Sequence, residues 1–173
     1  MPEPEVWLRG PLDGYHPMVM PVAHSLLQVR EDLAWLERTV APEQLWARPG
    51  GAASIGFHIR HTGGALDRLL TYARGETLSA AQLLFLAGED APGDPPVLLS
   101  TLAIGVNAVI DRCLAQLRTV DPARLLDARE VGRGRLPSTM LGLLVHAAEH
   151  STRHMGQAIT TARILCGSPP ASV

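Results

Sequence analysis

Four long stretches of this sequence carry apolar residues at intervals of three and four, which is the spacing of one face of an α-helix. They span residues 19–40, 54–74, 97–120 and 138–165, and each is followed within two residues by glycine or proline. Both residues commonly end helices. No alternating apolar and polar run extends beyond a few residues, so the pattern predicts an all-α fold.

The connections between these stretches indicate how the helices are arranged. Residues 76–95 form the longest one, in which Ser79 is predicted to cap a short helix that ends near Leu86. A connection of this length can cross the whole bundle and make the second and third long helices parallel neighbours. The basic segment 125–137 is predicted to be irregular, with room for a short hairpin. We therefore expect a four-helix bundle over residues 19–167, an irregular lead-in over 1–18 and a C-terminal tail over 168–173.

Composition excludes several classes of protein. The 173 residues suit one domain. The net charge is −2 and residues of both signs are interspersed along the chain, which gives no basis for binding nucleic acid or an anionic membrane. Cys113 and Cys166 form no CxxC pair, so two buried thiols are predicted rather than a disulfide framework. The start of the chain lacks the features of a secretory signal, and no apolar stretch reaches the roughly 20 residues that span a bilayer. The sequence predicts a soluble, cytoplasmic protein.

Five histidines in two of the predicted helices indicate a metal site. His146, His150 and His154 follow one another at four-residue spacing and therefore share a helix face, while His58 and His61 lie in the second helix. We expect His150 and His154 to bind one ion with a histidine of the second helix, although periodicity places His58 nearer the apolar face than His61. Three protein ligands leave a coordination position for water or substrate. Neutral imidazole suits zinc, nickel, iron(II) and copper alike.

Other interpretations of these residues stay open. Residues 146–150 match H-x-x-E-H, the inverted zincin pattern in which a glutamate, here Glu149, is the general base. Glu149 could instead orient a ligand or be a solvated helix residue. The histidines could also be surface or interface residues, which is the expected role of the isolated His24. A carboxylate-rich di-iron site is not expected, since Asp67 and Glu149 belong to no Glu-x-x-His pair.

Two segments resemble motifs of the DinB/YfiT-like superfamily of proposed metalloenzymes. Residues 54–61, SIGFHIRH, resemble its second-helix motif, and residues 149–157, EHSTRHMGQ, resemble its fourth-helix motif, which ends in H-x-G-Q. The likeness extends from about Met20 to Leu165. It implies a bundle with a long crossover between helices two and three, often a homodimer. It also implies a divalent metal ion, with zinc and nickel ahead of iron and manganese, bound by His61, His150 and His154. His58 and His146 then become candidates for the wall of the metal pocket or for contacts with the metal ligands.

The known activities of that superfamily imply a first functional hypothesis, a metal-dependent thiol S-transferase or hydrolase. Its members include enzymes that join low-molecular-weight thiols to electrophiles and enzymes that isomerise maleylpyruvate. Arg133, Arg135 and Arg153 are candidates for binding an acidic cosubstrate, and each also fits a solvated surface position. The second hypothesis is a non-catalytic, metal-binding dimeric bundle in stress response. Although the family is named after a DNA-damage-inducible gene, no basic patch here supports direct action on DNA.

Overall fold

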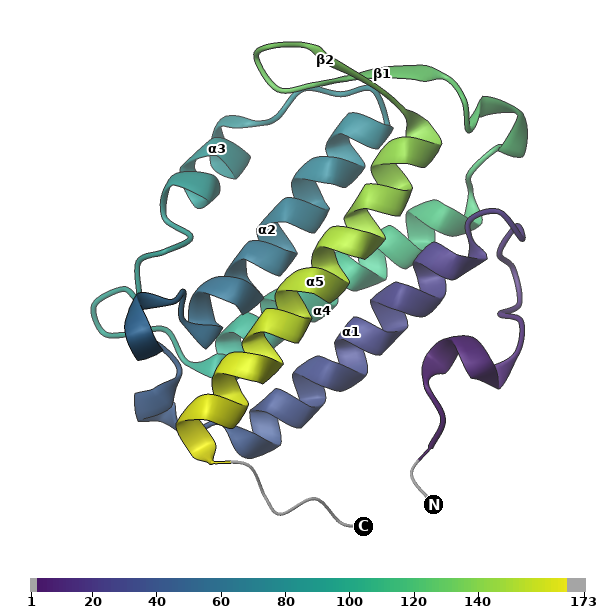
Figure 1. The fold of residues 1–173 in the computed structure, drawn as a ribbon. Helices are drawn as coiled ribbons and strands as arrows, with labels where there is room; N and C mark the ends of the chain where they lie inside the picture. The colour runs from purple at the N-terminus through teal and green to yellow at the C-terminus, as the bar shows by residue number, and fades with distance from the viewer. Residues whose placement is uncertain (1–2, 168–173) are drawn as a thin grey trace.

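The protein, described by a computed structural model over residues 3–167, is built around four long helices. These are α1 (Met20–Thr39), α2 (Ile55–Ala73), α4 (Leu99–Arg118) and α5 (Met140–Cys166) (Figure 1). A short helix α3 (Ala80–Ala87) and a hairpin of β1 (Ala128–Val131) and β2 (Leu136–Thr139) lie outside the bundle. Single 3-10 turns occupy Val6–Arg9, Pro42–Gln44, Pro49–Gly51 and Pro122–Arg124. The predicted all-α bundle is confirmed.

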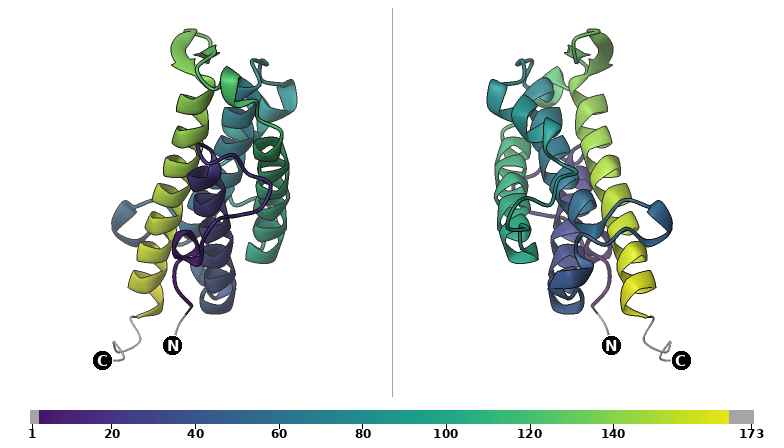
Figure 2. Two further views of the ribbon diagram at one scale, coloured as in Figure 1. Left: turned by 90° about the vertical axis from the view of Figure 1, so that its right-hand side faces the viewer. Right: turned by 90° about the vertical axis from the view of Figure 1, so that its left-hand side faces the viewer.

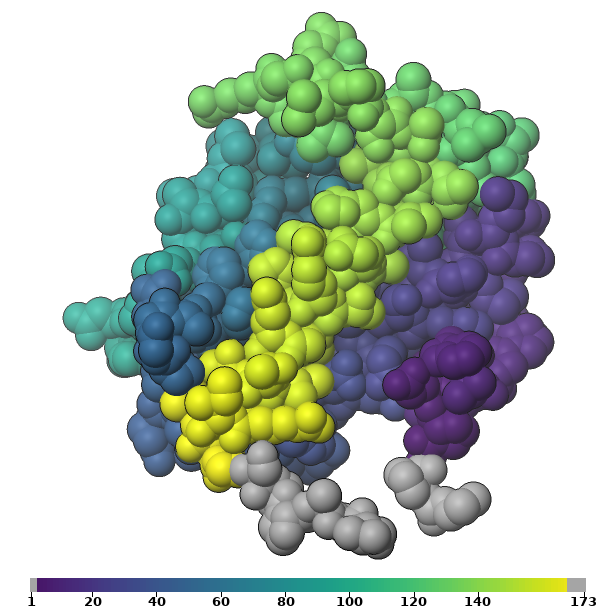
Figure 3. Space-filling view, in the orientation of Figure 1, coloured from purple at the N-terminus to yellow at the C-terminus, as the bar shows by residue number. Residues whose placement is uncertain are grey.

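The long helices form a square in which each contacts two neighbours. α5 packs between α1 and α2, and α4 packs against both of them on the opposite side (Figures 1 and 2). α2 and α4 run in the same direction, because the connection that carries α3 returns along the length of the bundle. The predicted crossover is therefore confirmed. In the space-filling view α5 runs diagonally across the face, with α2 on one side and α1 on the other (Figure 3).

Local sequence signals explain where the helices begin. Ser79 caps α3 as predicted, and Ser54 caps α2 in the same way, since each hydroxyl accepts a hydrogen bond from the backbone N–H three residues later. The last long helix begins at Met140, two residues later than the periodicity predicts. Ser138 and Thr139 instead pair with β1 in the hairpin, and the Thr139 hydroxyl caps α5. Every other long helix begins or ends within two residues of its predicted bounds.

The core lies where the helical stripes of the sequence meet. All four long helices contribute side chains with no more than 2% exposure, among them Leu26, Leu33, Leu36, Ile59, Leu66, Ile110, Leu117, Leu144 and Met155. Cys113 is buried in this core, and Cys166 is partly buried at the end of α5. Burying each large aliphatic side chain contributes roughly 1.5–3 kcal/mol, so this seam of leucine and isoleucine accounts for much of the stability. It also fixes the rotation of α2 and α5, on which the histidines depend.

The lead-in is irregular apart from one 3-10 turn, yet it lies along α1. The backbone N–H of Val6 donates to Gln28 Oε1 at 3.1 Å, and Arg9 binds the Glu31 carboxylate at 2.8 Å. Tyr15 is buried against the core. The predicted C-terminal tail, 168–173, lies outside the described residues. Within residues 3–167, no helix has the length and apolar character that crossing a membrane would require.

Candidate metal centre

Three histidine side chains converge between α2 and α5. His61 projects from the middle of α2, while His150 and His154 project from successive turns of α5. Their ring centroids are 4.5–5.0 Å apart, and one ring nitrogen of each lies within 4.8 Å of one ring nitrogen of the others. Tetrahedral zinc with bonds of about 2.1 Å holds its ligand nitrogens roughly 3.4 Å apart. Small rotations of the side chains bring the three nitrogens to that spacing, so this cluster could hold a metal ion.

Burial keeps the two α5 histidines of the cluster neutral. Burial lowers the pKa of His150 to about 4, helped by positive charge on His61 and Arg153. Burial likewise lowers the pKa of His154 to about 3, helped by His61, His150, His58 and Arg153. Neutral imidazole has the lone pair that a metal ion requires. At pH 7 both residues are therefore in the form that binds metal.

A buried ion pair holds the outer edge of His61. Its Nδ1 lies 2.7 Å from Oε2 of Glu89, whose other oxygen accepts from Arg68 Nη1 at 2.6 Å. Glu89 is 3% exposed and Arg68 is 8% exposed. Because a carboxylate accepts hydrogen bonds, the Nδ1 nitrogen of His61 carries the proton and its Nε2 faces α5 with a free lone pair. A carboxylate behind a ligating histidine is the usual way in which proteins fix that orientation.

His58 performs a similar role for His154. The Nδ1 atoms of the two rings are 3.1 Å apart, so one ring donates to the other and this contact fixes the orientation of His154, whose Nε2 takes no part in it. His58 is 7% exposed, and burial lowers its pKa, with positive charge on His61 adding to the shift. The periodicity of α2 thus correctly marks His58 as the more buried of the two α2 histidines. His61, at its flank, is the one within the cluster.

His150 connects the cluster to the surface. Its Nε2 lies 2.9 Å from His61 Nε2, and its Nδ1 lies 2.8 Å from Arg153 Nη2. Arginine can only donate, so Nδ1 of His150 accepts and its Nε2 donates to His61. A directed chain of hydrogen bonds therefore runs from Arg153 through His150 and His61 to Glu89.

The H-x-x-E-H residues also lie together, but on the outer surface of α5. His146, Glu149 and His150 form a second group whose ligand atoms fall within 4.8 Å, and the first two are exposed. Glu149 pairs with Arg153 at 3.2 Å and with His146 at 3.4 Å. This arrangement uses a single helix and has no wall around it. Since His150 belongs to both groups, it can serve only one of them at a time.

The remaining residues singled out in the sequence lie elsewhere. His24 Nε2 is 3.0 Å from the carbonyl of Gly10, which ties the lead-in to α1. Asp67 pairs with Arg112 at 3.0 Å, and Arg135 pairs with Glu130 at 2.6 Å in the hairpin. Arg133 is exposed in the same hairpin. Of the three candidate arginines, Arg153 is the one that contacts the cluster.

Sequence reasoning missed Glu89. It lies in the loop after α3, 28 residues from His61, and its neighbours Gly88, Asp90 and Gly93 give it the composition of an ordinary solvated turn. Gly64 carries an indirect signal, because a Cβ at this position would overlap both the Glu89 carboxylate and the Arg68 guanidinium. A glycine pair in the middle of a predicted helix, Gly63 and Gly64, marks a close approach of another segment.

Comparison with known proteins identifies a family that covers this part of the chain. The family model described as the DinB superfamily matches residues 25–158, which include α2, the α3 connection and the histidines of α5. No curated protein matches the chain.

Proposed function

The chain belongs to the DinB superfamily, and we propose that it binds one divalent metal ion through His61, His150 and His154 and uses it to activate a small nucleophile. The reaction class we propose is thiol transfer or hydrolysis on a small-molecule substrate. The supporting observation is the convergence of three imidazoles from two helices, of which His150 and His154 are kept neutral by burial.

The donor set fits the expected ion. Three imidazole nitrogens suit zinc or nickel, and they leave a coordination position for a further group. A divalent ion held there would lower the pKa of a thiol or water placed next to it and so supply a nucleophile at neutral pH. Two of the three histidines have an outer partner that fixes the ring, Glu89 for His61 and His58 for His154.

Neighbouring side chains would shape the reaction. Phe57 stacks on His61 with ring centroids 5.3 Å apart and planes inclined by 17°, which keeps water off that face of the imidazole. Arg153 is exposed at the mouth and could attract an anionic cosubstrate. The buried Glu89 and Arg68 close the site on the α3 side.

Metal content tests the ligand assignment directly. The purified protein is expected to take up one equivalent of zinc or nickel, and His150→Ala should abolish this uptake. His146→Ala is the matched control, because it removes an exposed histidine one turn earlier on the same helix and should leave uptake intact. Equal uptake by all three proteins would contradict the proposal, and loss of uptake in both His146→Ala and His150→Ala would favour the H-x-x-E-H group.

The hydrogen bonds between the rings of α2 and α5 favour a second function, a non-catalytic bundle that the histidines hold together. This function predicts that metal removal lowers the melting temperature while no reaction between a thiol and an electrophile is accelerated. A conjugation screen with zinc, nickel or manganese distinguishes the two. The homodimer implied by the family likeness stays a prediction, which light scattering tests.

A further inference from the structure

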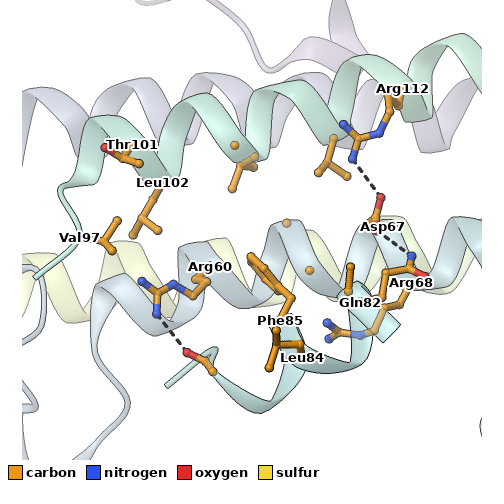
Figure 4. A pocket seen from close by; sticks show the side chains of 17 residues that line it. Arg60, Asp67, Arg68, Gln82, Leu84, Phe85, Val97, Thr101, Leu102 and Arg112 are labelled. Carbon is orange, nitrogen blue, oxygen red and sulfur yellow. Dashed lines mark hydrogen bonds and ion pairs between the residues drawn. The ribbon is translucent and has the colours of Figure 1, made fainter. Parts of the chain in front are cut away.

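A cavity of about 720 Å³ lies between α2, α3 and α4 (Figure 4), and the three histidines of the cluster are not among the residues that line it. Pockets that bind small molecules typically measure roughly 300–1,000 Å³. Glycines open its walls, Gly63 and Gly64 on α2 and Gly105 on α4. A Cβ built on Gly105 meets no atom within 4 Å, so α4 faces open space at this point.

The walls of the cavity are mostly apolar. They include Leu84, Phe85, Val97, Leu102, Val106 and Val109. Helix α3 supplies two of these residues although none of its own residues is buried, and Leu84 is 76% exposed. A short helix this rich in leucine normally hides one face. Here polar contacts hold its ends, as when Gln82 donates to Asp67 at 2.7 Å, and its apolar side chains border the cavity.

The charges around the cavity do not cancel. Three arginines line it, and two of them have carboxylate partners: Arg68 pairs with Glu89 at 2.6 Å and Arg112 pairs with Asp67 at 3.0 Å. Arg60 makes no ion pair within the described part of the chain. One guanidinium at one end of the cavity therefore lacks a counter-charge.

The contacts of Arg60 hold it in place without neutralising it. Its Nη1 donates to the carbonyls of Gly88 and Ala91, and its guanidinium lies over the Trp46 ring, 4.8 Å from the centroid. Burial lowers the pKa of Arg60, which Glu89 partly offsets by raising it. The charge thus loses hydration while its Nε and Nη2 remain without a hydrogen bond among residues 3–167. Thr101 brings a hydroxyl to the same end (Figure 4).

We infer that this cavity binds a small molecule with an apolar body and a single carboxylate, which Arg60 holds at one end while the body lies along Val106, Val109 and Phe85. An arginine presents paired donors that match a carboxylate in both geometry and charge. The cavity is distinct from the histidine cluster, because α2 turns about 100° per residue and Arg60 and Gly63 lie on another side of this helix from His61, although Arg68 and Glu89 lie between the two sites. The inference stands whether or not the histidines bind metal.

Titration calorimetry with decanoate tests this inference on the full chain, well below the micelle concentration. One decanoate per chain is expected to bind, and decan-1-ol and decylamine, with the same chain length, should bind at least ~10-fold more weakly, as expected for loss of a charged hydrogen bond. Gly105→Leu should abolish binding by filling the cavity. It should not unfold the protein, because its side chain enters open space.

Substitution of Arg60 locates the carboxylate. Arg60→Gln should weaken decanoate roughly 10-fold while leaving decan-1-ol unchanged, and Arg60→Lys should retain the preference for decanoate. The lysine variant matters because Arg60 also holds the loop of Gly88 and Ala91, so a melting curve must accompany each titration. Arg112→Gln, at the opposite end, should change decanoate affinity by less than about two-fold. His150→Ala should bind decanoate normally, which separates this site from the metal proposal.

Several results would overturn the inference. Equal affinity for decanoate and decan-1-ol would show that Arg60 does not bind the carboxylate. Normal decanoate binding by Gly105→Leu would show that the ligand binds outside this cavity. Absence of any decanoate binding would show that the cavity does not take an apolar carboxylate.

Discussion

Replacing Glu89 by glutamine should weaken metal binding at the histidine cluster. The carboxylate accepts from His61 Nδ1 at 2.7 Å and from Arg68 Nη1 at 2.6 Å, and its side chain is 4% exposed. A glutamine of the same shape has one acceptor oxygen and one NH2 group. Because the NH2 group cannot accept a hydrogen bond, one of the two donors loses its acceptor. Loss of such an outer partner typically lowers metal affinity ~10–100-fold, which corresponds to about 1.4–2.7 kcal/mol.

The same substitution also disturbs the fold, so a matched variant is needed. Removing one partner of a buried ion pair costs about 3–5 kcal/mol of the free energy of unfolding. Arg68→Met removes the other partner of the same pair, yet it leaves the contact between Glu89 and His61 in place. Both variants should lose stability to urea by similar amounts. Only Glu89→Gln should lose zinc affinity.

Zinc affinity is measured by competition with a chromophoric chelator at urea-free conditions where both variants are folded. Equal losses of affinity in Arg68→Met and Glu89→Gln would show that the ion pair acts only through the fold. Normal affinity in Glu89→Gln would show that the carboxylate does not orient His61. Either outcome would refute the role deduced from the hydrogen bonds.

Three further outcomes follow from the structure. Arg153→Gln should raise zinc affinity up to about 5-fold, measured by the same competition, because it removes an exposed positive charge and a donor that occupies a ring nitrogen of the cluster. Burial raises the pKa of Cys113 to about 12, so in the native protein at pH 8 Cys166 should react with a thiol reagent first, as peptide mass spectrometry would show. Gly64→Ala should lower the free energy of unfolding by about 1–3 kcal/mol, whereas Gly105→Ala should raise it by about 0.5–1 kcal/mol in urea titrations, since a Cβ overlaps buried side chains only at the first position.

The sequence predicts those parts of the fold that depend on local signals. Hydroxyl caps at Ser54 and Ser79, and stop signals such as Gly75, determine the helix ends within a few residues of the chain. Apolar periodicity likewise ranks His58 as more buried than His61. Helix α5 begins two residues after its predicted start, as α4 does, and at α5 the reason is that Ser138 and Thr139 pair with β1 across the hairpin and Thr139 also caps the helix.

The surroundings of the cluster could not be read from the sequence, because they depend on contacts between distant segments. Glu89 reaches His61 from a loop whose path is determined by where Arg60 binds the carbonyls of Gly88 and Ala91. The cavity beyond Arg60 is a space between three helices, and no residue pattern encodes it. Gly64 is the one sequence feature that reports on this region, since it indicates a close approach without identifying what approaches.

The direction of the hydrogen bonds shows which histidine must change the position of its proton when the cluster binds a metal ion. His61 already presents a bare Nε2, because Glu89 holds the proton on Nδ1, whereas the Nε2 of His154 is bare only when its Nδ1 donates to His58. His150 is different: Arg153 donates to its Nδ1, which places the proton on the Nε2 that points at His61. For that nitrogen to bind a cation, its proton must be lost or must move to Nδ1. Either change ends the hydrogen bond that His150 donates to His61, and a proton on Nδ1 also ends the one that it accepts from Arg153. The tautomer of His61 is therefore prepared by a buried carboxylate, whereas that of His150 is controlled by an arginine at the surface, where a solute or an anionic substrate can reach it.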